Sequence, residues 1–299
     1  MYELKKVGER TWYMSAPTNI GFYLHNAPEV CMIDAGGDRE AAEKALEHIR
    51  AQGWRLTGLY LTHSHADHTG GAAFIHEQTG CRVFAPGISA AVVKHSFLLP
   101  TTLYGGCPNT EMCNKFLFPP ACDCAELTEQ ALPAGLHAVR LDGHDMAQTA
   151  YKTSDGVCFT ADCVVSSFAL SKHRISFIYS VGHHFEALET LYRLDGSLFI
   201  PSHDIPCTDI KPLVQINRDA VHEVAQDILE MCSQPLTIDE IISRALEKYS
   251  IRLYLMQYLL VGQTVRSYIS WLQEKGDIVP VFDGTKLLFV RSDNKAHDN

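Results

Sequence analysis

Three histidines and an aspartate fall within six consecutive positions of LTHSHADHTG at residues 61–70, directly after an apolar run. Neutral imidazoles and carboxylates are the natural protein ligands of zinc, manganese and iron. His63 and His65 lie two residues apart, so in an extended turn they can point to the same side. Asp67 and His68 follow and can address a second, adjacent point. The spacing predicts a loop that offers two ligands to each of two metal positions.

Three later polar residues supply ligand types that this loop still lacks. His144 closely follows the apolar run HAVRL, Asp162 follows VCF, and His203 follows LFI. In open α/β sheets, ligand sites gather at the ends of the strands. We therefore expect all three residues to face the same edge as the motif loop, so that one metal centre draws on four separate segments.

The order H-x-H-x-D-H, then Gly-His, then a small residue with Asp, then a final His, resembles the metallo-β-lactamase superfamily over about residues 5–208. The resemblance implies a four-layer αββα sandwich. It also implies a division of the ligands: His63, His65 and His144 for one metal, Asp67, His68 and His203 for the other, and Asp162 as the bridge. Asp34 in MIDAGG matches an acidic position that supports the motif loop without being a ligand.

What the resemblance implies chemically is a dinuclear hydrolase. Two divalent transition-metal ions, with zinc expected and manganese or iron as alternatives, would lower the pKa of a bridging water. The resulting hydroxide would attack an ester, thioester, lactone, amide or phosphoester of a small-molecule substrate. Asp67 is the expected catalytic residue, orienting the hydroxide and carrying a proton. The run DGHDMAQT and Ala161 before the bridge depart from the family pattern and leave the substrate open.

Two other classes of function stay open. A mononuclear iron dioxygenase acting on a persulfide uses a related ligand set, but the intact histidines favour hydrolysis. A metal-sensing regulator that binds DNA through the C-terminal part is the second alternative. The formal net charge of −10 argues against nucleic acid as a partner, because binding phosphates needs a basic face.

The elements that must position these residues have the texture of a layered α/β protein. Short β-branched or aromatic runs predict strands, and apolar residues at helical spacing predict helices. The predicted strands lie at 10–15, 20–25, 30–35, 56–62, 81–86, 137–141, 149–153, 157–162 and 197–202, and the first helices at 38–53 and 70–80. Residues 1–208 are expected to form the catalytic domain.

An irregular insertion at 97–135 interrupts this pattern. It contains a cluster of four cysteines: Cys107, Cys113, Cys122 and Cys124. Their spacing does not fit a structural zinc site, so a redox-sensitive thiol loop is the favoured interpretation over a second metal site. Tyr104 in the insertion, and His183 and His184 later in the chain, are further candidates for contact with substrate. Lys172, His173 and Arg174 form a small basic patch.

Residues 209–292 change to a helical texture. Helices are predicted at 216–232, 236–249 and 265–276, the second with a capping box, followed by a hairpin at 277–292. We interpret this part as a winged-helix-like domain through which the chain forms a homodimer, and 293–299 as a disordered tail. No run approaches about 18 apolar residues, and no export signal is recognisable, so the prediction is a cytoplasmic protein without membrane contact.

Overall fold

The first β-sheet holds seven strands in their order along the chain, within residues 1–292, the part that the computed structural model describes. They are β1 (Glu3–Lys6), β2 (Thr11–Ser15), β3 (Ile20–Asn26), β4 (Glu29–Ile33), β5 (Arg55–Tyr60), β6 (Arg82–Ala85) and β7 (Ala125–Glu126). Strands β1 to β4 pair antiparallel through short turns, and β4 to β7 pair parallel. Parallel pairing needs longer crossover connections, and these carry the helices.

The second β-sheet holds four strands in the order β11-β10-β9-β8. They are β8 (Leu136–Arg140), β9 (Thr149–Thr153), β10 (Val157–Phe159) and β11 (Leu198–Ile200). Only β10 and β11 pair parallel. The chain between these two strands forms the short 3-10 helix η2 (Ala161–Cys163) and the helices α6 (Ser167–Lys172) and α7 (Val181–Arg193).

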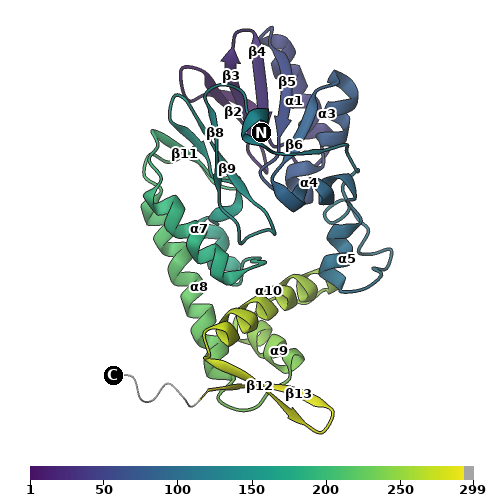
Figure 1. Cartoon of the computed structure of the whole chain (residues 1–299), viewed down its shortest axis with the longest axis vertical. Coiled ribbons are helices and arrows are strands. Elements are labelled where there is room, and N and C mark those ends of the chain that lie inside the picture. The colour runs from purple at the N-terminus through teal and green to yellow at the C-terminus, as the bar shows by residue number, and fades with distance from the viewer. Residues whose placement is uncertain (293–299) are drawn as a thin grey trace.

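Helices cover the outer face of each sheet, so the molecule has four layers (Figure 1). On the first sheet lie α1 (Arg39–Ala51), α3 (Ala72–Thr79) and α4 (Gly87–Lys94), and on the second lie α7 and the start of α8 (Lys211–Met231). This arrangement confirms the predicted αββα fold. The short helix α2 (Ala66–Thr69) and the helix α5 (Leu98–Tyr104) complete this part of the chain, with a single 3-10 turn, η1 (Glu129–Ala131), before β8.

Strand β4 shows why the layers form. Successive side chains of a strand point to opposite faces. Val30 and Met32 pack into the core beneath the helices, whereas Cys31 and Ile33 pack into the core between the two sheets. Both faces are buried, which is why this strand is a continuous apolar run rather than an alternating one.

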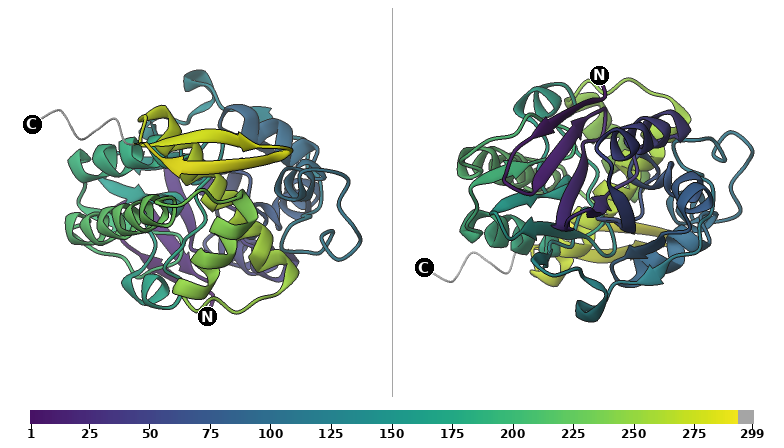
Figure 2. Two further views of the ribbon diagram at one scale, coloured as in Figure 1. Left: turned by 90° about the horizontal axis from the view of Figure 1, so that it is seen from below. Right: turned by 90° about the horizontal axis from the view of Figure 1, so that it is seen from above.

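The C-terminal region has a core of its own, built by α8, α9 (Ile238–Lys248), α10 (Leu255–Glu274), β12 (Ile278–Asp283) and β13 (Lys286–Arg291). The predicted capping box is present, with Thr237 and Glu240 bonded to each other's backbone. Seen from below, the β12–β13 hairpin lies across this end of the molecule (Figure 2).

Helix α8 belongs to both parts of the molecule. Val214 packs on the second sheet, whereas Val224 and Ile228 lie in the C-terminal core. The division predicted at 208/209 therefore falls just ahead of a shared helix, and its position stays a prediction. Residues 293–299, predicted as a disordered tail, lie outside the described residues. Within residues 1–292, no helix is long and apolar enough to cross a membrane.

Candidate metal centre

The motif loop connects the end of β5 to α2. It is packed closely against residues 35–38, which follow β4. A side chain at Gly70 would bring its Cβ within 2.2 Å of the Gly37 carbonyl oxygen, and at Gly71 within 2.4 Å of the Ala35 carbonyl oxygen. Glycine is required here because the two backbones approach this closely. Gly70 and Gly71 thus allow the loop to lie against the segment that follows Asp34.

The structure brings His63, His65 and His144 together as one group of ligand atoms. His65 Nδ1 lies 3.0 Å from His63 Nε2 and 2.9 Å from His144 Nε2. The remaining nitrogen of His144, Nδ1, donates to the carbonyl oxygen of Phe177 at 3.0 Å. That bond leaves Nε2 as the free acceptor and turns it toward the group, the usual way in which a protein orients a metal-binding histidine.

Asp67, His68, Asp162 and His203 form a second group. His203 Nε2 lies 3.1 Å from Asp67 Oδ2 and 3.2 Å from Asp162 Oδ2. Asp162 Oδ1 lies 3.3 Å from His68 Nε2, and Asp162 Oδ2 lies 3.5 Å from His144 Nε2 of the first group. The Asp162 carboxylate therefore lies between the two groups, within reach of both.

Two buried atoms of the second group, His68 Nε2 and Asp162 Oδ1, have no hydrogen-bond partner. A buried polar atom without a partner costs about 1–3 kcal/mol, so such atoms need an explanation. A cation between them would satisfy both. The donor set of imidazole and carboxylate is also the one that zinc, manganese and iron accept. The residues of the site fit divalent metal ions.

The partners of the other ring nitrogens fix the orientation of the second group. His68 Nδ1 donates to Asp34 Oδ2 at 2.8 Å, and His203 Nδ1 donates to the Pro17 carbonyl oxygen at 2.8 Å. Asp34 also accepts from the backbone N–H of Thr62 at 2.7 Å. Asp34 is thus placed as the sequence resemblance implied, beside the motif loop and behind His68.

The two groups differ in how they hold protons. Burial lowers the pKa of His63 well below its usual value and that of His144 to about 4, so both rings are neutral at pH 7. Burial also lowers the pKa of His68, but the Asp162 and Asp67 carboxylates more than offset it and raise that pKa well above its usual value. The Asp162 charge raises the pKa of His203 to about 10.

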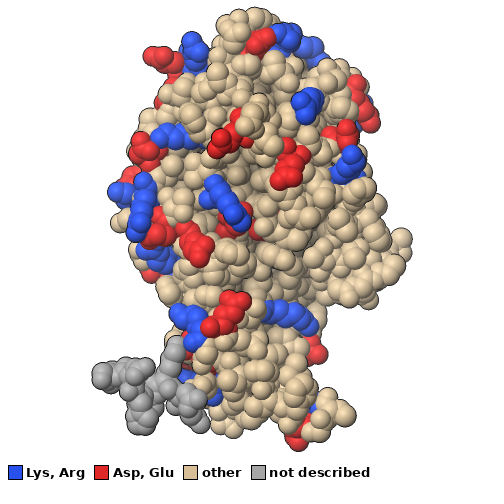
Figure 3. All heavy atoms as spheres, in the orientation of Figure 1, with Lys and Arg blue, Asp and Glu red and all other residues tan. Residues whose placement is uncertain are grey.

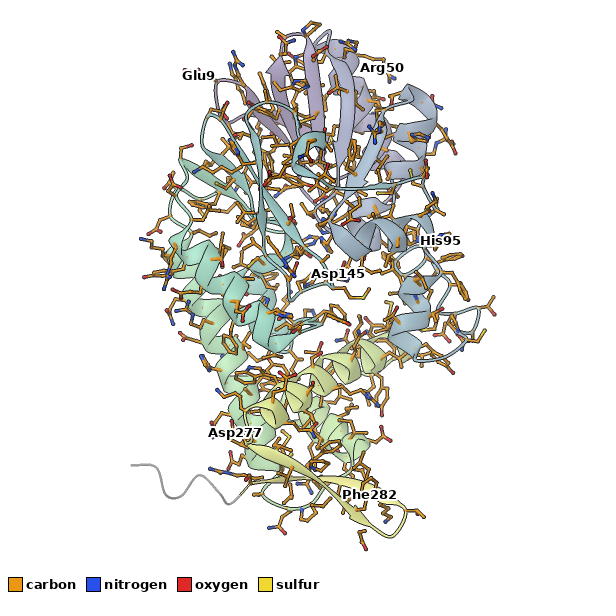
Figure 4. All side chains as sticks on the ribbon, in the orientation of Figure 1. Glu9, Arg50, His95, Asp145, Asp277 and Phe282 are labelled. Carbon is orange, nitrogen blue, oxygen red and sulfur yellow. The ribbon has the colours of Figure 1, made fainter. Side chains whose placement is uncertain are left out.

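Asp145 is a buried carboxylate that the sequence analysis did not single out. It accepts hydrogen bonds from the Ser64 backbone N–H at 3.0 Å, the Ser64 hydroxyl at 2.6 Å and the Ser89 hydroxyl at 3.2 Å. It therefore ties the segment of His144 to the motif loop. Figure 4 shows it at the end of the two sheets that faces the C-terminal helices. Its only signal in the sequence was its place next to His144.

A cavity of about 390 Å³ opens from the two groups toward the C-terminal region. His65, Asp67, His144 and Asp162 line one end of it. Phe177 also lies at this end, with its ring against His65 and His144. The rest of the lining comes from Leu99 and Leu103 of α5, Phe116 and Leu117 after it, Tyr179, and Met256, Leu260 and Gln263 of α10. The insertion and the C-terminal region thus share the site with the catalytic core.

Several residues proposed for substrate contact lie elsewhere. Tyr104 is 43% exposed and does not line the cavity. His183 lines a different hollow, beside Arg140. His184 is buried, and its backbone packs against Gly143, where a Cβ would lie 2.3 Å from the His184 nitrogen. Arg174 of the small basic patch is bonded to Glu223.

The four clustered cysteines do not meet. Within residues 1–292, no three cysteines come close enough to share a metal ion. Cys122 and Cys124 are buried beneath the helices of the first sheet, and burial raises their pKa to about 11 and about 12. Thiols with such pKa values are poor nucleophiles at neutral pH, so a redox role for these two is disfavoured. Cys107 is exposed.

Comparison with known proteins places this geometry in a wider context. The profile of the metallo-beta-lactamase superfamily matches residues 17–203. A beta-lactamase domain protein from Burkholderia ambifaria has a similar structure, with a TM-score of 0.74 at 16% identity, over 97% of this chain and 94% of that one. For a metallo-beta-lactamase family protein from Thermus thermophilus, the TM-score is 0.68 at 19% identity, over 94% and 98%. At these identities the likeness concerns the fold alone.

Curated relatives match a shorter part of the chain. The hydroxyacylglutathione hydrolase of Rhodopseudomonas palustris (strain BisB18) is 36% identical over 75 residues, which is 25% of this chain and 29% of that protein. That of Erythrobacter litoralis (strain HTCC2594) is 40% identical over 70 residues, 23% of this chain and 26% of that protein. The chain spans less than a third of the length of these relatives. The profile match over more than half of the sequence shows that the chain belongs to the metallo-β-lactamase superfamily.

Proposed function

We propose that the chain is a dinuclear hydrolase that holds two divalent transition-metal ions, zinc in the first place. The observation that carries the proposal is the position of Asp162. One of its oxygens lies 3.3 Å from His68 Nε2 and the other lies 3.5 Å from His144 Nε2. A carboxylate within reach of two ligand groups is suited to bridge two ions. The set His63, His65 and His144 would hold one ion, and Asp67, His68 and His203 the other.

The residues of the chain would divide the chemistry among themselves. Two bound ions supply Lewis acidity and a water of lowered pKa at neutral pH. Asp67 is suited to orient that water and to take up its proton, because its side chain is half exposed while its Oδ2 lies 3.6 Å from His68 Nε2. The Thr18 hydroxyl donates to the same oxygen at 3.3 Å and restricts its direction.

The proposal also covers the class of bond that the enzyme hydrolyses. Esters, thioesters, lactones, amides and phosphoesters all present an oxygen that such a centre can polarise. The partial likeness to hydroxyacylglutathione hydrolases supports thioesters as the first class to test. The phosphoester class fits less well, since no Lys or Arg lines the cavity in the described part of the chain.

The test combines metal analysis with a substrate panel. Protein purified without chelator is expected to contain about two transition-metal ions per chain and to hydrolyse at least one of the esters, thioesters, lactones, lactams and phosphodiesters offered. Asp162→Asn should abolish hydrolysis. Asp195→Asn, which removes an exposed carboxylate that pairs with Lys152, is the matched control and should be fully active. One tightly bound iron with oxygen uptake on a persulfide would overturn the proposal in favour of the dioxygenase.

Three further predictions accompany this function. Three helices followed by an antiparallel hairpin support a winged-helix-like C-terminal domain. The homodimer through that domain stays a prediction, which light scattering would test, as does the cytoplasmic location. Salt-dependent binding of DNA would instead support the regulator.

A further inference from the structure

The cavity next to the metal-ligand groups changes character along its length. At the inner end its lining consists of imidazoles and carboxylates, His65, Asp67, His144 and Asp162. At the outer end leucine, phenylalanine and methionine side chains predominate, beside the uncharged polar Thr102, Tyr179 and Gln263. Within residues 1–292 no Lys or Arg is among the lining residues. A substrate that fills the cavity therefore presents its reactive group to the inner end and an uncharged, apolar group to the outer end.

Two segments far apart in the sequence form the outer end. Helix α5 contributes Leu99 and Leu103, and helix α10 contributes Met256 and Leu260. The two helices lie against each other at this point (Figure 1). The C-terminal region is thus a wall of the substrate site.

Exposed aromatic side chains surround the opening, with Lys115 beside one of them. Phe116 lines the cavity and is 64% exposed, so it marks the opening. Phe97, Tyr104 and Phe118 of the same segment are exposed as well. In Figure 3 the bulge at α5 bears no charged side chain on the face in view. An apolar surface that continues into an apolar cavity favours an apolar ligand over a charged one.

We propose that the outer end of this cavity binds the acyl chain of an uncharged, apolar ester or thioester, and that Leu260 of α10 and Leu103 of α5 set the chain length accepted. The proposal rests on the hydrolase function proposed above and names its substrate class. In the reaction, the oxygen of water forms a bond to the acyl carbon and the C–O or C–S bond breaks. The acyl chain leaves as the acid, and the alcohol or thiol takes the proton.

The physical consequence is selection by chain length. Each buried CH₂ group contributes about 0.8 kcal/mol, which is about a fourfold gain in kcat/KM. The gain should continue with each added CH₂ until the cavity is filled and should then stop. A tryptophan at the outer end occupies that volume and should end the gain at a shorter chain.

The test measures kcat/KM for acetyl, butanoyl and octanoyl esters and thioesters with one leaving group. The octanoyl-to-acetyl ratio should exceed tenfold in the natural protein. It should fall at least tenfold in Leu260→Trp and in Leu103→Trp, which approach the cavity from opposite helices. Leu253→Trp is the matched control, because Leu253 is 64% exposed and does not line the cavity. Its ratio should not change.

A binding measurement separates this proposal from the hydrolase function. Calorimetry compares octanoate with acetate on the zinc-loaded protein and on the same variants. Octanoate that binds at least tenfold tighter than acetate, with the difference lost in both cavity variants, supports the acyl site even if no substrate is hydrolysed, in which case the hydrolase proposal alone fails. Equal binding and equal kcat/KM for all chain lengths, with hydrolysis intact, would overturn the acyl site and leave the hydrolase standing.

Discussion

The two ends of the cavity are built in contrasting ways. The inner end consists of charged and polar groups whose directions are set by further hydrogen bonds, as Asp34 sets His68 and the Phe177 carbonyl sets His144. The outer end is lined mainly by apolar side chains from α5 and α10, beside the polar Thr102 and Gln263. The inner end is suited to the chemistry, because hydrogen bonds between fixed partners tolerate little change. The outer end is suited to substrate specificity, because apolar packing tolerates substitution.

Removing the metal ions should have the largest effect on activity and stability. This change acts only on the inner end of the cavity. Dialysis against a chelator is expected to abolish hydrolysis and to lower the melting temperature. A ligand present at a thousandfold over its Kd stabilises the folded state by about 4 kcal/mol, which corresponds to about 10 °C for a protein of this size class. Calorimetry before and after re-addition of zinc measures it. An unchanged melting temperature would show that the two ligand groups do not hold metal ions.

The pH dependence of metal binding should reveal the carboxylate-rich group. In the metal-free protein, the Asp162 charge raises the pKa of His203 to about 10, so this ring carries a proton at neutral pH and must lose it to bind metal. Zinc affinity should therefore rise at least about a hundredfold from pH 6 to pH 8, because His68, whose pKa is also raised well above its usual value, must lose a proton as well. Calorimetry in buffers of different ionisation heat measures the proton release. Affinity independent of pH would contradict the assignment of His203.

The raised pKa of His203 also predicts how the stability of the metal-free protein changes with pH. A histidine whose pKa is raised on folding contributes stability that is complete below its unfolded pKa of about 6.5. That contribution is lost as pH rises toward the folded pKa of about 10. Metal-free protein should thus unfold at a lower urea concentration at pH 9 than at pH 6, and His203→Gln should flatten this trend.

Substitution of Asp145 tests whether the hydrogen bonds behind the inner end of the cavity contribute to metal binding. Asp145→Asn weakens the bonds from Ser64 and Ser89, and loss of such a supporting group typically costs 10–100-fold in metal affinity or activity. Asp155→Asn is a fitting control, because Asp155 also accepts several hydrogen bonds, from Thr11 and the Arg10 backbone, but lies outside the site. It should cost stability and leave zinc affinity as it was. Equal zinc affinity in the two variants would show that Asp145 does not support the metal centre.

The smallest effect is expected at Ala161, directly before Asp162, whose carboxylate lies between the two groups. Its φ of +52° lies in the left-handed region, which costs a residue with a Cβ about 1–2 kcal/mol. Ala161→Gly removes that strain, but it increases the entropy of the unfolded chain, which costs about 0.5–1 kcal/mol of stability. The net change in unfolding free energy should stay within about 1 kcal/mol, with metal content unaltered, as denaturant titration and metal analysis would show. A loss of metal would mean that Ala161 positions Asp162.

Much of the fold was predictable from local patterns. The expected strands and first helices are present, because continuous apolar runs such as β4 identify strands buried on both faces. Helix α10 was only partly predicted. The apolar spacing predicts a start at residue 265, but the helix begins at Leu255. Gly262 and Thr264 weaken helical propensity in this stretch, but both are buried by tertiary packing, which overrides that weakness.

The sequence by itself determined the inventory of the site: which side chains can bind metal, their order along the chain and the family in which that order occurs. These follow from residue type and from spacing within a few positions. Only the tertiary structure decided which atoms face one another. Asp145 beside Ser64, the Phe177 carbonyl behind His144, and α10 against α5 join residues about 30 to 160 positions apart. Such pairs arise from the packing of whole layers, and no local pattern encodes them.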